Sequence, residues 1–134
     1  MKISSSFLLA AGFGVMLAVP VFAHHSFAAQ YDRNKPVTLI GPVTKIDWIN
    51  PHARFFVDVK NANGKVVNWE VELASPAMLM RRGWTRNSLK LGESVTVNAF
   101  LATDGSNLAN ASTVTLADGR KVFAGSSGDA GNTP

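Results

Sequence analysis

The chain has 134 residues, of which 46% are apolar and 16% are charged, and its formal net charge is +4. This length and composition predict one domain with a real hydrophobic core, and they exclude a fibrous or largely disordered protein. No cysteine is present, which excludes disulfides, thiolate metal sites and cysteine nucleophiles. The modest positive charge is compatible with anionic partners, or simply with a basic soluble surface.

The N-terminal segment has the pattern of a cleaved export signal. Lys2 supplies positive charge, residues 7–19 are almost wholly apolar, and Pro20 ends this run before Val21-Phe22-Ala23. A signal peptidase recognises small residues directly before the bond that it cuts. The apolar segment at residues 7–19 is also shorter than the roughly 20 residues of a membrane-spanning helix. We therefore expect a protein that begins at His24, is periplasmic or secreted and does not span the membrane. In that compartment anionic lipid head groups or polysaccharides are more accessible partners than nucleic acid.

Strand patterns begin after a short polar lead-in. Apolar residues alternate with others from Val37, and their phase slips by one at Ile46, which predicts a β-bulge in the first strand. Asn63-Gly64 stands between two alternating runs and predicts a hairpin, because both residues tolerate positive φ. The first three strands are therefore expected to form a meander.

The third strand has the most regular pattern in the chain. Its apolar positions share one face, which we expect to point into the core: Val67, Trp69, Val71 and Leu73. Glu70 and Glu72 share the opposite face, and we expect both in water because no third polar group in the sequence is tied to them. Two carboxylates roughly 7 Å apart on a strand are also compatible with glycosidase chemistry, an interpretation that we favour less.

One short helix interrupts the strands. Ser75 is placed to cap it, Pro76 suits its first position and Gly83 suits its end. Two strands follow, with a short return at residues 121–123. The mainly β order, with one short helix between strands three and four, is that of a small five-stranded OB-like Greek-key barrel. A small β-sandwich or an open meander with a helical lid fits the same order and stays open as an alternative.

The expected organisation has four parts. They are a signal peptide at 1–23, an N-terminal lead-in at 24–36, an OB-like barrel domain at 37–123 and a tail at 124–134. The tail is rich in Gly, Ser and Asp and lacks an apolar pattern, which predicts disorder. We expect this single domain to be a monomer.

Several motifs are spread along the chain from residue 24 onward. They are His24-His25-Ser26-Phe27, Gly41-Pro42-Val43-Thr44-Lys45, Asn50-Pro51-His52, Trp69-Glu70-Val71-Glu72-Leu73, Arg81-Arg82-Gly83-Trp84-Thr85 and Leu116-Ala117-Asp118-Gly119-Arg120. Together they resemble a bacterial exported family catalogued as domain of unknown function 6152. The resemblance implies a location outside the cytoplasm and a small β-rich domain, and it supplies no catalytic residues to carry over.

The three histidines form a candidate metal site. Cleavage before His24 gives that residue a free amine beside its imidazole, and the two nitrogens can chelate one ion. A third nitrogen from His25 or His52 would complete a site suited to Cu(II), which binds such ligands more tightly than other divalent first-row ions. In the alternative interpretation, His24 and His25 are a solvated chain end and His52 caps a turn.

The densest basic cluster surrounds an aromatic residue. It consists of Arg81, Arg82, Trp84 and Arg86. Such a cluster could bind a saccharide, an anionic polymer or a protein of the envelope, although arginines at a helix C-terminus are also favourable for dipole reasons. The sequence has no nucleophile elbow, phosphate loop, dinucleotide fingerprint or zinc-helix motif. It therefore predicts a non-enzymatic binding module, with copper or, alternatively, an envelope component as ligand.

Overall fold

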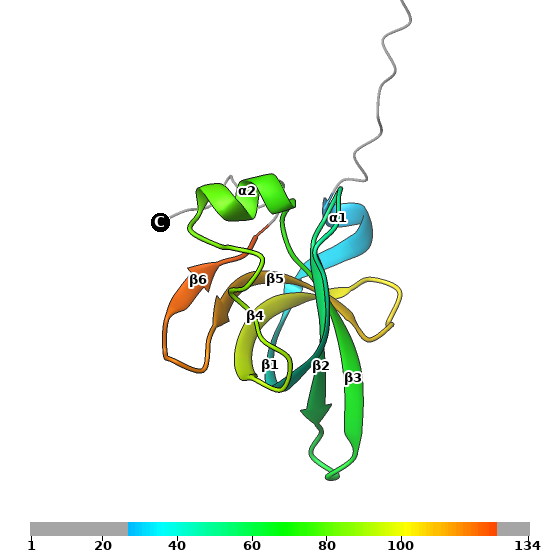
Figure 1. The fold of residues 1–134 in the computed structure, drawn as a ribbon. Coiled ribbons are helices and arrows are strands. Elements are labelled where there is room, and N and C mark those ends of the chain that lie inside the picture. Colours follow the sequence, from blue (N-terminus) through cyan, green and yellow to red (C-terminus); the bar gives the residue numbers. More distant parts are fainter. Residues whose placement is uncertain (1–26, 126–134) are drawn as a thin grey trace, which may run out of the picture.

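The computed structural model describes residues 27–125, and these form a mainly β domain (Figure 1). Its strands are β1 (Tyr31–Asp47), β2 (Arg54–Lys60), β3 (Val66–Glu72), β4 (Ser94–Ala102), β5 (Leu108–Thr115) and β6 (Lys121–Phe123). Helix α1 (Phe27–Gln30) precedes β1, and helix α2 (Pro76–Arg81) connects β3 to β4. The mainly β class and the short helix after the third strand are confirmed.

The strands form one sheet in which β1 to β5 close into a ring. Their order is β3-β2-β1-β4-β5-β6, and β3 pairs with β5 as well, so that the pairings of β1 to β5 form a ring. The β3–β5 pairing is parallel, whereas the other neighbours are antiparallel. Strand β1 pairs with both β2 and β4, and its register against β2 shifts between Val43 and Lys45. This shift confirms the bulge that the phase slip predicts.

The core fills the space enclosed by these strands and is closed at one end by α2 (Figure 1). Its largest fully buried apolar side chains are Trp84, Phe55, Leu73, Leu79, Val43, Val57, Val71, Val95, Val97 and Val114. Along residues 67–73 the predicted phase is confirmed for Val71 and Leu73, which are buried, and for Trp69, which packs against the core, whereas Val67 is half-buried and lies outside the core cluster. The opposite face differs from the prediction, because Glu72 is only 5% exposed.

Both boundaries of the folded part extend beyond the predicted domain. Strand β1 begins at Tyr31 rather than Val37, because Tyr31 is buried and pairs with Ala102 on β4. At the other end Ala124 is buried, and its N–H donates to the Ser112 carbonyl at 2.8 Å. Ala124 thus belongs to the folded part and not to the tail. The predicted signal peptide, His24, His25 and residues 126–134 lie outside the described residues.

Ser75 caps α2 as predicted. Its side chain accepts a hydrogen bond from the Met78 N–H at 3.3 Å, and Pro76 occupies the first helical turn. We expect Ser75→Ala to lower the free energy of unfolding by about 1 kcal/mol, because it leaves this N–H without an acceptor. Urea unfolding measures the loss, and Ser75→Asp, which keeps an acceptor, should lose much less. Equal losses in the two variants would contradict the capping role.

Candidate functional site

His52 lies in the loop between β1 and β2, and its ring is held against the end of β3. The side chain is half-buried, and its Nδ1 lies 3.2 Å from the Leu73 carbonyl oxygen. A hydrogen bond to this carbonyl requires a proton on Nδ1, so the ring donates through that nitrogen. His52 is therefore oriented by the fold, and Nε2 is the ring nitrogen that this bond does not use.

The other two predicted metal ligands, His24 and His25, precede the described residues. Between residues 27 and 125, no three or more His, Asp or Glu side chains are grouped so that they could hold a metal ion.

The predicted cluster of Arg81, Arg82, Trp84 and Arg86 does not form a common surface. Trp84 is 2% exposed, and its indole N–H donates to the Phe123 carbonyl at 3.0 Å, so that the ring belongs to the core. The Arg82 guanidinium stacks on the Phe123 ring at 4.2 Å and donates to the Gly125 carbonyl. Arg81 and Arg86 are exposed. The prediction of an aromatic platform at Trp84 is wrong, because α2 and β6 close the core over this ring.

A second polar cluster, which the sequence did not reveal, surrounds Glu72. Arg54 on β2 pairs with Glu70 and reaches Glu72 at 3.5 Å, both on β3. Asn110 on β5 donates to Glu72 at 3.2 Å, and Tyr31 at the start of β1 lies beside the same carboxylate. We call these five residues the Glu72 cluster. Four strands contribute to it, which is why no local sequence pattern indicates it.

The Glu72 cluster is buried to different depths. The side chain of Glu72 is 6% exposed, whereas those of Glu70 and Arg54 are 28% and 39% exposed. Burial of its hydroxyl, reinforced by the negative charge of Glu72, raises the pKa of Tyr31. Among the described residues, the Tyr31 hydroxyl and Asn110 Oδ1 are the buried side-chain polar atoms without a hydrogen-bond partner. The cluster joins the β3–β5 pairing to the start of β1.

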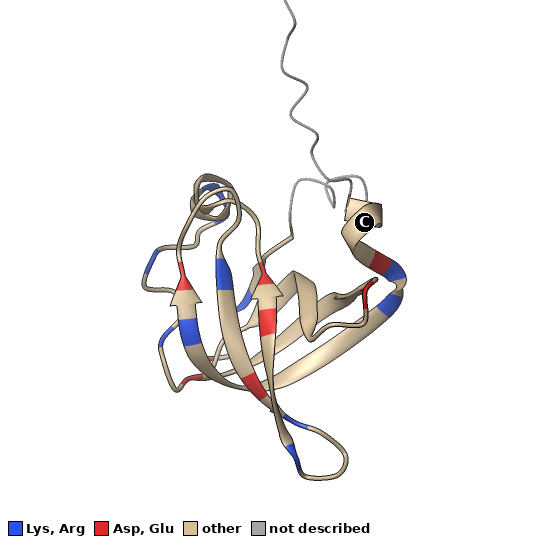
Figure 2. Cartoon of the chain, turned by 90° about the vertical axis from the view of Figure 1, so that its right-hand side faces the viewer, with Lys and Arg blue, Asp and Glu red and all other residues tan. Residues whose placement is uncertain are grey.

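Charges on the neighbouring strands alternate in sign rather than forming a patch of one sign (Figure 2). Lys45 and Asp47 on β1 pair at 2.7 Å, next to the Arg54 pairs on β2 and β3. Asp58 on β2 accepts a hydrogen bond from Asn68 on β3 at 2.7 Å. Because Lys45 and Arg54 each pair with carboxylates here, these strands do not form the positive surface that would attract an anionic polymer.

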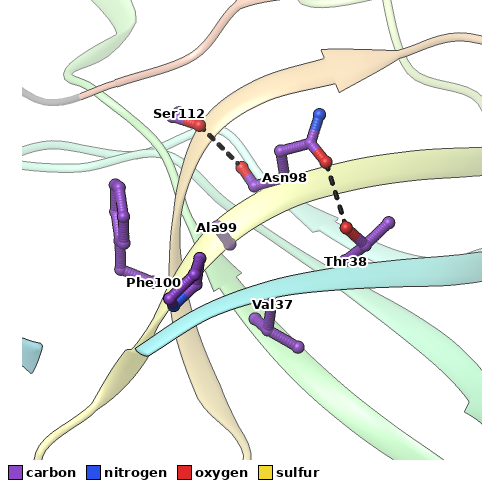
Figure 3. A pocket seen from close by; sticks show the side chains of 7 residues that line it. Val37, Thr38, Asn98, Ala99, Phe100 and Ser112 are labelled. Atoms are coloured by element: carbon purple, nitrogen blue, oxygen red, sulfur yellow. Dashed lines mark hydrogen bonds between the residues drawn. The ribbon is translucent and has the colours of Figure 1, made fainter. Parts of the chain in front are cut away.

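A shallow pocket of about 260 Å³ lies on another part of the surface, where β1, β4 and β5 run side by side (Figure 3). Seven residues line it: Pro36, Val37, Thr38, Asn98, Ala99, Phe100 and Ser112. The Thr38 hydroxyl donates to Asn98 Oδ1 at 3.2 Å, and the Ser112 hydroxyl donates to the Asn98 carbonyl at 3.0 Å. None of the seven residues is charged, which distinguishes the pocket from the Glu72 cluster.

No helix between residues 27 and 125 has the length and apolar character needed to cross a membrane.

The fold and these sites define a small, mainly β protein organised around one core. The model of a family of unknown function, DUF6152, matches residues 14–111, and the chain belongs to this family. The resemblance inferred from the motifs is thereby confirmed. Neither a curated protein nor a solved structure matches the chain.

Proposed function

We propose that the protein is an exported binding module with an OB-like barrel. Export is supported by the N-terminal sequence pattern. The OB-like topology is supported by the ring of pairings β1-β2-β3-β5-β4 and by the position of α2 between β3 and β4. Such a barrel is a stable scaffold whose ends and faces carry ligand sites.

Its ligand is Cu(II), bound by the amine and imidazole of His24 together with a second imidazole. The observation that carries this proposal is the orientation of His52, whose Nδ1 lies 3.2 Å from the Leu73 carbonyl. Histidines that bind metals commonly donate their other ring N–H to a carbonyl or carboxylate, which fixes the tautomer and the direction of the lone pair. Amine and imidazole nitrogens are ligands that Cu(II) binds well.

The alternative, an envelope ligand bound at Arg81, Arg82, Trp84 and Arg86, has less support. An exposed aromatic ring is the part of that site that would stack on a sugar or a planar group. Trp84 is 2% exposed, and the Arg82 guanidinium already contacts Phe123. We therefore place copper binding first.

Copper binding should depend on a free amine at His24. Acetylating the amine of His24 blocks the two-nitrogen chelate of that residue and leaves all three imidazoles in place. We expect the acetylated protein to bind Cu(II) at least about tenfold more weakly than the mature protein in calorimetric titration. Equal affinities would show that the histidines are a solvated end and a turn, and would contradict the proposal.

The pH dependence and two variants define the ligand set further. Free α-amino groups titrate near pH 7.7–8.0 and imidazoles near pH 6.5, so protons compete for both nitrogens and affinity should fall from pH 8 to pH 6. His25→Ala and His52→Ala, compared under the same conditions, identify the third nitrogen. If His52 is that ligand, only His52→Ala weakens binding. Loss in His25→Ala alone would place the site entirely at the chain end.

A further inference from the structure

The geometry points to a second, metal-independent site: the pocket between β1, β4 and β5 binds a neutral pyranose unit of a glycan. This inference does not depend on copper binding. Two irregularities of the sheet, the composition of the lining and the direction of its hydrogen bonds support it.

Two irregularities flank the same three residues of β4. On one side the β1–β4 register shifts between Tyr31 and Pro36, so that residues 32–35 stand opposite Leu101 alone. On the other side Asn98 pairs with Thr113 and Ala99 pairs with Ala111, which leaves Ser112 as an extra residue of β5. Bulges of this kind redirect side chains and are over-represented next to functional sites. Here they create the hollow over Asn98, Ala99 and Phe100.

The aromatic part of the pocket is held in place. The Phe100 ring is half-buried and meets Phe27 of α1 edge-on, with ring centroids 5.9 Å apart and an interplanar angle of 88°. In Figure 3 this ring stands on one side of the pocket, and the polar side chains Asn98, Ser112 and Thr38 stand on the other. A ligand there meets an apolar surface and hydrogen-bonding groups at the same time. Sugar rings have both an apolar C–H face and polar edges.

The hydrogen bonds of the lining leave mainly acceptors toward the pocket. Thr38 and Ser112 each use their hydroxyl proton in a bond to Asn98, and their oxygens keep lone pairs. The Asn98 amide donates to Thr113 Oγ1 at 3.1 Å and has one further N–H. An anion needs several hydrogen-bond donors, and this lining offers mainly acceptors. A cation pairs with carboxylates, and the lining contains none. Hydroxyl groups both donate and accept, so a neutral polyhydroxyl ring matches this set best.

The size of the pocket matches one ring rather than a larger molecule. Its volume of about 260 Å³ lies below the range of roughly 300–1,000 Å³ typical of sites for drug-sized ligands. Because the pocket is small and open, it should bind one sugar unit weakly, with a dissociation constant on the order of 1 mM. The ligand is therefore expected to be part of a larger glycan.

The test is a titration of the folded protein followed by amide NMR spectra, with EDTA present to exclude metal effects. The probes are maltotriose, which is neutral, and trigalacturonic acid, which has the same number of rings and is anionic. We expect maltotriose to shift the amide signals of residues 37, 38, 98–100 and 112. No shift at these residues up to about 50 mM, well above the expected dissociation constant, would overturn the inference. Stronger binding of trigalacturonic acid would overturn the assignment of a neutral ligand.

Variants locate the site. Thr38→Val removes one hydroxyl acceptor with little change of shape and should weaken maltotriose binding about fivefold. Phe100→Leu removes the flat ring and should weaken it about tenfold. Thr96→Val is the matched control, because Thr96 lies two residues from Asn98 on the same strand and does not line the pocket. Should Phe100→Leu fail to fold, Thr38→Val still decides, and equal effects of Thr38→Val and Thr96→Val would overturn the inference.

Discussion

Replacing Gly41 with alanine should prevent stable folding. A Cβ atom at this position would lie 1.8 Å from the Asp58 carbonyl oxygen and 2.9 Å from its carbon. These are backbone atoms of β2, so no rotation of a side chain can relieve the overlap. The two strands would have to separate at the point where β1 passes between its partners β2 and β4. We expect a loss of more than about 4 kcal/mol of unfolding free energy, or no folded protein at all.

A second glycine provides the control for this prediction. Gly105 has a φ of +77°, and a Cβ added there would meet no atom within 4 Å, so alanine at this position is strained but does not collide. Gly105→Ala should cost about 1–2 kcal/mol, because an L-residue is strained in a left-handed backbone conformation. Urea unfolding compares the two variants. A loss in Gly41→Ala no larger than that in Gly105→Ala would mean that β1 and β2 can move apart easily.

The parts of the fold that depend on local chemistry could be predicted from the sequence. The alternation in residues 67–73, the hairpin at Asn63-Gly64 and the cap at Ser75 each depend on neighbouring residues, and each appears in the structure. The start of β1 at Tyr31 could not be predicted, because its burial depends on β4, some 70 residues later. The burial of Trp84 could not be predicted for the same reason, because its indole N–H donates to the carbonyl of Phe123, which is also distant in the sequence.

The candidate sites likewise divide into features that depend on neighbouring residues and features that depend on distant strands. The sequence pattern identified His52 in a loop but could not indicate the Leu73 carbonyl that orients its ring. The pocket lined by Asn98 and Phe100 depends on two register shifts between strands, and the Glu72 cluster draws on four strands. Period-two alternation correctly put Glu72 opposite the core face of β3. It could not reveal that Asn110 and Tyr31 cover that face.

Replacing Glu72 with alanine should therefore destabilise the protein strongly, although its position in the strand pattern predicts an exposed residue. The variant removes a carboxylate that is 6% exposed, leaves the Asn110 N–H without its acceptor and takes one partner from Arg54. Removing one member of a buried polar network costs both the lost bonds and the desolvation of the groups left behind. We expect a loss of about 3–5 kcal/mol in urea unfolding.

Two further variants separate burial from charge. Glu72→Gln keeps the shape and one acceptor for Asn110, so its loss should be about 1–2 kcal/mol. Glu70→Ala removes the more exposed partner of Arg54 and should cost at most about 1 kcal/mol, as is usual for ion pairs near the surface. The expected order of stability is thus Glu70→Ala above Glu72→Gln above Glu72→Ala. If Glu72→Ala instead costs no more than about 0.5 kcal/mol, the carboxylate lies in water and the β3–β5 pairing is not held by this cluster.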